Sequence, residues 1–310
     1  MPQLFLVSYA TDQFQRVRRE LNASAIEVGI PKSNILSYSL DDLHGSAFYR
    51  ENREILDAVC GAGYWAWKPY FILEAMTQLD DGDALFYCDA GSLFAASPAP
   101  LIDLCLRSDS GVVLFDARPL TNRQFTKRDC FVCLGCDEAK YWDSFEVIAT
   151  VLVLRKCEFV LRFLKEWLGY CRDARAITDQ PNTCGMKDLP GFIQHRWDQA
   201  ILSVLAAKHS LETYRNPTLW GNFLKLPEFR ADGEIVASPY NLVPSIRDYA
   251  KLPQENSRYG TIFIINRQPN VVGKKPIVPP AAEMTGKRDW SLTLRSATWI
   301  RRVGRRLRIR

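Results

Sequence analysis

Two short stretches of the sequence carry the side chains best suited to chemistry. In the first, Asp89 directly follows the apolar run 84–88, and Gly91 lies two positions further on. A carboxylate at the end of a buried strand can bind ligand hydroxyl groups or a cation, and a glycine lets the backbone approach the ligand closely or take a positive φ. The second stretch, 195–199, gathers a histidine, an arginine, an aspartate and a glutamine. Together they predict a binding or catalytic site, whereas each alone could be a turn or a helix cap.

The sequence pattern also predicts the elements that must position these side chains. Pro69 suits the first turn of a helix, and apolar residues recur through 71–79 at a spacing of roughly 3.6. Turn-forming residues separate that helix from the run 84–88, which is typical of a strand buried on both faces. A second apolar helix opens at Asp198 and Gln199. Because open α/β sheets bind ligands outside the carboxyl ends of their strands, Asp89 is well placed to meet one.

The rest of the chain predicts an α/β protein in two parts. A first strand that feeds a helix is a common start of an α/β domain. The periodic signal fades after about residue 215, and the glycine and prolines of 268–283 are typical of a linker. We therefore expect a catalytic or binding domain over 1–240 and a C-terminal extension over 241–310. The other elements predicted are strands at 4–9, 35–38, 111–115 and 259–266, and helices at 98–106, at 157–170 and, ending near residue 22, after the first strand. The segment 147–154 is strongly apolar.

Composition limits the kind of protein this can be. The chain has 310 residues, of which 47% are hydrophobic, so it can bury a large core. The apolar run at 4–7 is too short for a signal peptide, and no stretch approaches the roughly 20 apolar residues of a membrane span. The sequence predicts a cytoplasmic protein.

Nine cysteines, an odd number, argue against the disulfide framework of a small secreted domain. Cys130, Cys133 and Cys136 have the spacing that opens some iron-sulfur and zinc sites. A fourth ligand is missing nearby, and apolar residues fill the gaps. We therefore interpret the three as small buried side chains, with a metal-sulfur protein as the alternative.

The formal net charge of +5 comes from the end of the chain. Seven arginines and no acid lie in 295–310, so the remainder carries 5 − 7 = −2. A body without a basic face argues against nucleic-acid binding. Within 290–310, Trp299, Ile300, Val303 and Leu307 lie near one helical face, which predicts a basic amphipathic helix at an anionic membrane surface. This would place the protein peripherally at the inner membrane face; a disordered, solvated tail is the alternative.

Four ordered motifs resemble those of bacterial glycosyltransferases of the GT-A type found among polysaccharide-synthesis enzymes. They cover about the first two-thirds of the chain and are more specific together than singly. The motifs are Gly63-Tyr64-Trp65-Ala66-Trp67-Lys68-Pro69, Tyr87-Cys88-Asp89-Ala90-Gly91, Thr126-Lys127-Arg128-Asp129 and His195-Arg196-Trp197-Asp198-Gln199.

The resemblance implies a GT-A, Rossmann-like domain with a mixed central sheet that binds a nucleotide-sugar donor. It implies donor contacts from Tyr9, Lys68, Asp89 and Gly91, with Asp89 at the ribose, the diphosphate or a metal ion. Many relatives have a second aspartate where Gly91 stands, which puts direct ligation of Mn²⁺ or Mg²⁺ by this chain in doubt. Magnesium can still be held by one carboxylate together with substrate phosphates.

The resemblance further implies transfer of the sugar to a glycan or lipid-linked glycan acceptor. If the configuration inverts, a base must take the acceptor proton, and Asp198 is the first choice and Asp129 the second. Asp198 could instead bind sugar hydroxyls, as in retaining families. The side chains assigned to the sugar or the acceptor are Trp65, Trp67, Lys127, His195, Arg196 and Gln199. The alternative function is non-catalytic binding of a carbohydrate or a membrane surface.

Overall fold

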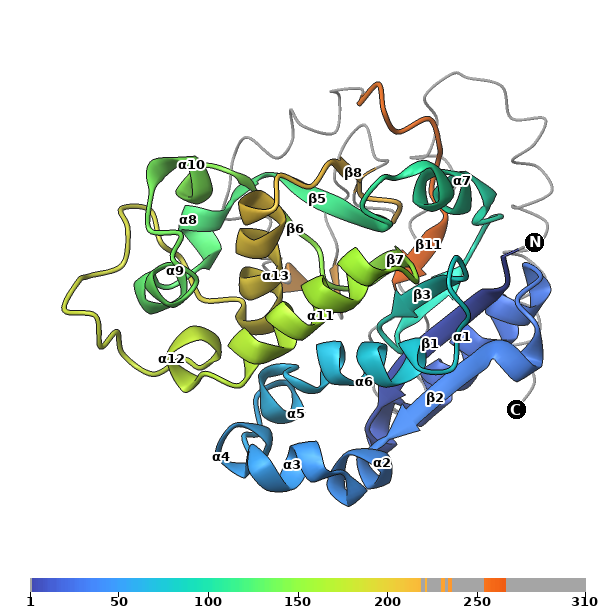
Figure 1. The fold of residues 1–310 in the computed structure, drawn as a ribbon, viewed down its shortest axis with the longest axis horizontal. Coiled ribbons are helices and arrows are strands. Elements are labelled where there is room, and N and C mark those ends of the chain that lie inside the picture. The colour runs from blue at the N-terminus through green and yellow to red at the C-terminus, as the bar shows by residue number, and fades with distance from the viewer. Residues whose placement is uncertain (1, 219–220, 222–229, 232–233, 236–253, 266–310) are drawn as a thin grey trace.

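The computed structural model of this chain describes residues 2–218, 221, 230–231, 234–235 and 254–265 (Figure 1). The predicted linker 268–283 and the basic tail 290–310 lie outside these residues, as does most of the predicted extension. Among the described residues, no helix has both the length and the apolar character needed to cross a membrane.

A seven-stranded mixed sheet forms the centre of the molecule. Its strands follow the order β2-β1-β3-β7-β5-β6, and β8 pairs with β5. β1 runs parallel to β2 and β3, whereas β7 is antiparallel to β3 and β5. The predicted α/β class with a mixed central sheet is therefore confirmed. The strands are β1 Leu4–Ala10, β2 Ile35–Ser39, β3 Ala84–Cys88, β4 Ser92–Phe94, β5 Val112–Thr121, β6 Phe145–Val147, β7 Val151–Arg155, β8 Thr213–Arg215, β9 Arg230–Ala231, β10 Glu234–Ile235 and β11 Phe263–Ile265.

Helices cover both faces of the sheet, as the ribbon in Figure 1 shows. α6, α11 and α13 pack on one face, and α1 and α7 on the other. The helices are α1 Gln15–Glu27, α2 Leu40–Gly45, α3 Ala47–Glu51, α4 Arg53–Leu56, α5 Gly61–Tyr64, α6 Trp67–Met76, α7 Ala99–Arg107, α8 Asn122–Phe125, α9 Arg128–Cys133, α10 Ala139–Trp142, α11 Glu158–Cys171, α12 Ala174–Ile177 and α13 Trp197–Lys208.

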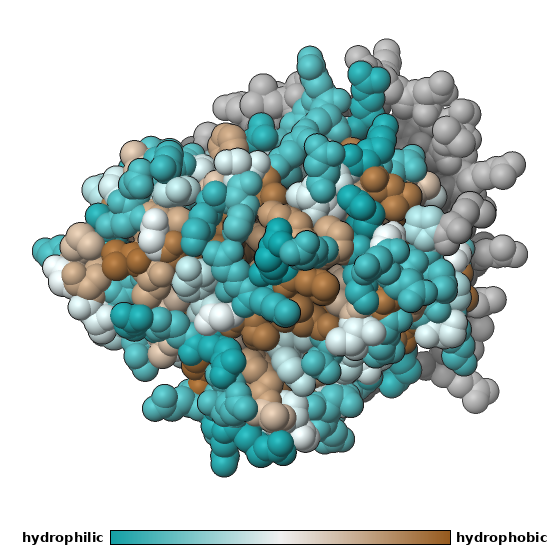
Figure 2. All heavy atoms as spheres, viewed as in Figure 1, coloured by the Kyte–Doolittle hydropathy of each residue, from teal (hydrophilic) through white to brown (hydrophobic). Residues whose placement is uncertain are grey.

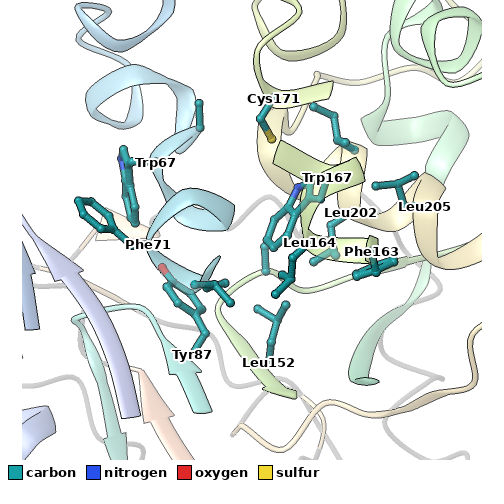
Figure 3. Packing of buried hydrophobic residues seen from close by; sticks show 14 of the residues in the cluster. Trp67, Phe71, Tyr87, Leu152, Phe163, Leu164, Trp167, Cys171, Leu202 and Leu205 are labelled. Atoms are coloured by element: carbon teal, nitrogen blue, oxygen red, sulfur yellow. The ribbon is translucent and has the colours of Figure 1, made fainter. Parts of the chain in front are cut away.

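The alternation of side chains along each strand divides the core into two clusters. Val7 and Tyr87 belong to the cluster on the α6, α11 and α13 side, whereas their neighbours Leu6 and Phe86 belong to the other. Figure 3 shows Tyr87 pointing from β3 into the helical layer, below Trp67 and Phe71, with Trp167 on the opposite side of the same cluster. On the face viewed in Figure 2, hydrophobic residues show as separate patches among hydrophilic ones.

Three segments differ from the sequence pattern or were left unassigned by it. The apolar segment 147–154 holds the end of β6 and most of β7, and 148–150 between them form part of a cavity wall. The polar stretch 41–54 forms three short helices, and a capping box between Ser39 and Asp42 opens the first. The predicted strand 259–266 is shorter, and β11 pairs with β4 outside the central sheet.

Cys130 and Cys136 are buried in the core cluster, as expected for small apolar side chains, whereas Cys133 is half-buried. In the described part of the chain, no group of three or more histidine, cysteine, aspartate or glutamate side chains is arranged to hold a metal ion.

Candidate functional site

A cavity of about 530 Å³ opens at the carboxyl ends of β1 and β3. Volumes of this order are typical of small-molecule sites. Four segments that are far apart in the sequence form its wall: the end of β1, the residues around the start of α6, the loop after β3, and the start of α13. The loop 148–150 closes the wall between β6 and β7.

One lysine joins two carboxylates in this wall. Lys68, near the start of α6, lies with its Nζ 2.7 Å from Oδ2 of Asp198 and 3.6 Å from Oδ1 of Asp89. The same ammonium donates a hydrogen bond of 3.0 Å to the carbonyl oxygen of Ala149. Lys68 is 3% exposed, and the Asp89 side chain, at 24%, is the most accessible member. We call Lys68, Asp89 and Asp198 the charged trio.

Hydrogen bonds to buried neighbours hold the two acidic residues of the charged trio in place. The hydroxyl of Tyr87 donates to Oδ1 of Asp89 at 2.7 Å, and the amide of Asp89 donates to the carbonyl of Thr150 at 2.9 Å. The indole of Trp167, on α11, donates to the carbonyl of Asp198 at 3.1 Å. The arrangement is therefore built into the core rather than into a mobile surface loop.

The pKa of Asp198 is raised to about 6, chiefly because burial disfavours the charged carboxylate; Lys68 opposes this shift and Asp89 adds to it. Asp198 is thus charged above that pH and can accept a proton there. A nearby carboxyl, Glu146 on β6, also has its pKa raised by burial, to about 7.

Glu146 holds two cavity residues from behind. Its side chain, which is 1% exposed, forms an ion pair with Nη1 of Arg196 at 2.5 Å and accepts a hydrogen bond of 2.7 Å from Nε2 of Gln199. Gln199 also accepts from the amide of Ala149 at 3.2 Å. Sequence reasoning missed Glu146; its only signal is an acidic residue beside the apolar run that begins at Val147.

The backbone before α6 is left-handed over five consecutive residues. From Gly61 to Trp65, φ lies between 50° and 97°, and Ala62, Tyr64 and Trp65 are not glycines. Such a conformation costs about 1–2 kcal/mol for each non-glycine residue. Strain of this kind is concentrated at functional sites, where the surrounding structure maintains it.

This left-handed turn presents Trp65 to a second tryptophan. The rings of Trp65 and Trp197 lie 5.0 Å apart at 31°, and both line the cavity. Trp197 also has a positive φ, of 44°, and its indole donates to Oδ1 of Asp179 at 3.0 Å. Sequence reasoning quoted Trp197 within a motif but assigned it no role.

The other expected donor and sugar contacts differ in how far they reach the cavity. Tyr9, Gly91 and Trp67 all line it. Trp67 is only 5% exposed, packs against Tyr9 with ring centroids 4.1 Å apart, and donates its indole N–H to the carbonyl of Gly61. It therefore forms the floor of the cavity and belongs mainly to the core. Burial raises the pKa of the Tyr9 hydroxyl to about 12, so this group stays a neutral donor.

Two residues predicted to bind the sugar or the acceptor, Lys127 and His195, lie outside the cavity wall and need correction. Lys127 is buried and donates to the carbonyls of Thr178 and Gln180. His195 is buried between the amide of Lys127 and the carbonyl of Ala176, and burial lowers its pKa to about 3. Neither side chain is placed to contact a sugar or an acceptor.

Asp129, the second choice for a base, faces a loop. Its carboxylate accepts hydrogen bonds from the amide and hydroxyl of Thr183 and from the amide of Cys184, at 2.7 to 2.9 Å. Although burial raises the pKa of Asp129, hydrogen bonds from Cys184 and Thr183 outweigh it and lower the pKa to about 2. A carboxylate so fully occupied is a poor base, and we interpret it as a structural anchor of the loop.

The residues around Asp89 do not fit a directly bound divalent cation. The place between the two carboxylates is taken by the ammonium of Lys68, and Gly91 offers no side-chain oxygen. An ion such as Mg²⁺ or Mn²⁺ needs several oxygen ligands at close range, and a neighbouring ammonium repels it.

No family model matches this chain, and no curated protein is similar to it in sequence. Solved structures of several glycosyltransferases are similar in part. Mouse xyloside xylosyltransferase 1 has a TM-score of 0.44 at 10% identity, over 86% of this chain and 98% of that one. A glycosyltransferase involved in the glycosylation of the major capsid of PBCV-1 has a TM-score of 0.38 at 11% identity, over 85% of this chain and 94% of that one. Galactosyltransferase LgtC, in complex with donor and acceptor sugar analogs, has a TM-score of 0.37 at 14% identity, over 84% of this chain and 86% of that one. Likenesses at this level do not assign the chain to a family.

Proposed function

We propose that this chain is a glycosyltransferase that moves a sugar from a nucleotide-sugar donor to a glycan acceptor. One observation carries the proposal: three motifs whose cavity residues lie up to 198 − 68 = 130 positions apart in the sequence supply one cavity. They contribute Lys68 from the first, Asp89 from the second and Asp198 from the fourth motif. The third motif supports this wall from outside, through the contact of Lys127 with His195.

The donor is expected to lie along the carboxyl ends of β1 and β3. Asp89 is the accessible carboxylate of the charged trio and would accept hydrogen bonds from ribose or sugar hydroxyls. Gly91 lets the ligand approach the backbone there. Two cations in the wall, Lys68 and Arg196, would stabilise the negative charge that develops on the diphosphate as it leaves.

Asp198 is our choice for the carboxylate that acts on the acceptor. In this step the acceptor oxygen bonds to the anomeric carbon while the bond to the diphosphate breaks. The bonding electrons leave with the nucleoside diphosphate, and the acceptor proton passes to Asp198. With its pKa at about 6, Asp198 is deprotonated and ready for this role at neutral pH.

Trp65 and Trp197 offer flat apolar faces for a sugar ring on the acceptor side, and Gln199, held by Glu146, offers hydrogen bonds to its hydroxyls. A lipid-linked polysaccharide acceptor at the inner membrane face would give the basic tail a purpose. That part of the proposal rests on the sequence alone. It predicts that deletion of the residues after Arg295 weakens binding to anionic liposomes.

A thermal-shift screen tests the function. Ligands that bind only the folded state raise the apparent Tm, so at least one nucleoside diphosphate in a panel should stabilise the protein. The variant Asp89→Ala should lose the shift, while Asp103→Ala, an exposed change on α7, should keep it. If sugars stabilise the protein and no nucleotide does, it is a non-catalytic carbohydrate-binding protein instead.

A further inference from the structure

We infer that Lys68 takes the place of a divalent cation in this cavity, so that the donor binds without a metal ion. The inference rests on the proposed function for the identity of the ligand. The unsuitability of Lys68, Asp89 and Asp198 for holding a metal ion does not depend on which ligand binds.

The geometry around Lys68 resembles that of a bound cation. Its ammonium contacts three oxygens from three segments of the chain: Oδ2 of Asp198 at 2.7 Å, the carbonyl of Ala149 at 3.0 Å and Oδ1 of Asp89 at 3.6 Å. The ring of Tyr87 lies 5.3 Å from the same ammonium. A buried lysine with this many partners stays in place, and it satisfies the oxygens that a metal would otherwise use.

Charge favours the same conclusion. With Asp89 and Asp198 ionised, the two acids would present two negative charges where a diphosphate has to bind. Lys68 neutralises one of them, whereas the charge of Arg196 is balanced by its ion pair with Glu146. Lys68 thus removes part of the repulsion that the two acids would exert on a diphosphate, which is the electrostatic role that a bound metal ion would otherwise have.

Removing the side chain of Lys68 should leave a metal site at the two remaining acids of the charged trio. The variant Lys68→Ala leaves Asp89, Asp198 and the Ala149 carbonyl facing one another without their cation. These are the hard oxygen ligands that Mn²⁺ and Mg²⁺ prefer. The ion is expected to bind only after the lysine has gone.

Electron paramagnetic resonance with Mn²⁺ alone provides the test. In the wild type, any Mn²⁺ binding should be the same with and without the change Asp89→Asn. Lys68→Ala should gain a site of Kd about 10⁻⁴–10⁻³ M, the range of weak oxygen-ligand sites. The double variant Lys68→Ala with Asp89→Asn should lose it. Lys140→Ala serves as the matched control, because Lys140 pairs with a single exposed acid, Glu138, and its removal should create no site. An Asp89-dependent Mn²⁺ site in the wild type would overturn the inference.

A second measurement needs no variant. The nucleoside diphosphate that stabilises the wild type should have the same Kd, within about twofold, in EDTA and in excess Mn²⁺ or Mg²⁺. A loss of tenfold or more in EDTA would overturn the inference while leaving the transferase proposal intact. If no nucleotide binds in either condition, the transferase proposal fails, and the Mn²⁺ measurement still decides the role of Lys68.

Discussion

Burial and a neighbouring lysine act on Asp198 in opposite directions, and their balance sets the pH at which this carboxylate is charged. Desolvation raises its pKa and Lys68 limits the rise, which leaves a value of about 6. A base must be deprotonated before it can accept a proton. The side chain is therefore available above pH 6 and is lost as a base below it.

The transfer rate should follow this titration. We expect kcat/KM to fall as the pH is lowered through about 6, because the protonated fraction of Asp198 grows. Asp198→Asn should lower the rate by about 10²–10⁴-fold, the usual contribution of a general base, and should remove the acidic limb. A pH profile of both proteins measures this. A variant that keeps more than a tenth of the wild-type rate would show that another group takes the proton.

Asp129 should contribute to stability rather than to transfer. Its folded-state pKa of about 2 is below the ordinary 3.8, so the stabilisation is present above 3.8 and is lost as the pH falls through 2. Asp129→Asn should reduce the free energy of unfolding near neutral pH by about 1–3 kcal/mol, the cost of leaving buried donors unpaired.

Urea unfolding at pH 7, 5 and 3 measures this contribution, and the gap between wild type and variant should narrow at the lowest pH. The exposed change Asp103→Asn should stay within about 0.5 kcal/mol of the wild type. A gap that is constant with pH would mean that the charge of Asp129 contributes nothing.

The motifs predicted which segments gather at the site, but not which way each side chain points. Asp89 followed from a buried strand that ends at a sheet edge, and Asp198 from the start of an apolar helix. Lys127, Asp129 and His195 lie in equally polar motifs, yet their side chains form hydrogen bonds with backbone groups outside the cavity wall. Nothing in a local pattern separates a polar residue that faces a cavity from one that satisfies buried carbonyl and amide groups.

Among the elements that the sequence did not reveal, the left-handed turn before α6 matters most for the site. The run 84–88 and the spacing through 71–79 predicted β3 and α6 because apolar periodicity reports burial. A positive φ at Ala62, Tyr64 or Trp65 opposes the local preference of those residues and is imposed by tertiary contacts. The turn is nonetheless what brings Trp65 to Trp197.

Gly63 should be difficult to replace in that turn. Its φ is +97°, and an added Cβ would lie 2.7 Å from Cα of Leu56, which is backbone and cannot move aside cheaply. Gly63→Ala should therefore reduce the free energy of unfolding by about 1–3 kcal/mol, the cost of a strained backbone conformation. Nucleotide and sugar binding should weaken with it, because the turn positions Trp65.

Gly169 provides a control of opposite sign. It is exposed within α11, and an added Cβ there meets nothing within 4 Å. Gly169→Ala should raise the free energy of unfolding by about 0.5–1 kcal/mol through helix propensity. Chemical denaturation of both variants gives the comparison, and a neutral Gly63→Ala would argue that the turn is not constrained as described.

For the molecule as a whole, the position of the cavity follows from the sheet. β1 and β3 run parallel, so Tyr9 and Asp89 reach the same edge, and α6 and α13 on the covering layer deliver Lys68 and Asp198 above it. The sequence predicted the α/β class and its buried strands. It did not predict that 148–150 would separate β6 from β7, because that break depends on the two strands pairing with different parts of β5.

Donor turnover tests most directly whether this cavity is a transferase site. Wild type, Asp198→Asn and Asp103→Ala would each be incubated with a panel of nucleotide-sugars and oligosaccharide acceptors, and release of the nucleoside diphosphate would be followed. We predict release by the wild type and by Asp103→Ala with at least one donor, and a loss of about 10²–10⁴-fold for Asp198→Asn. No release by the wild type with any donor, or equal release by Asp198→Asn, would contradict the assignment.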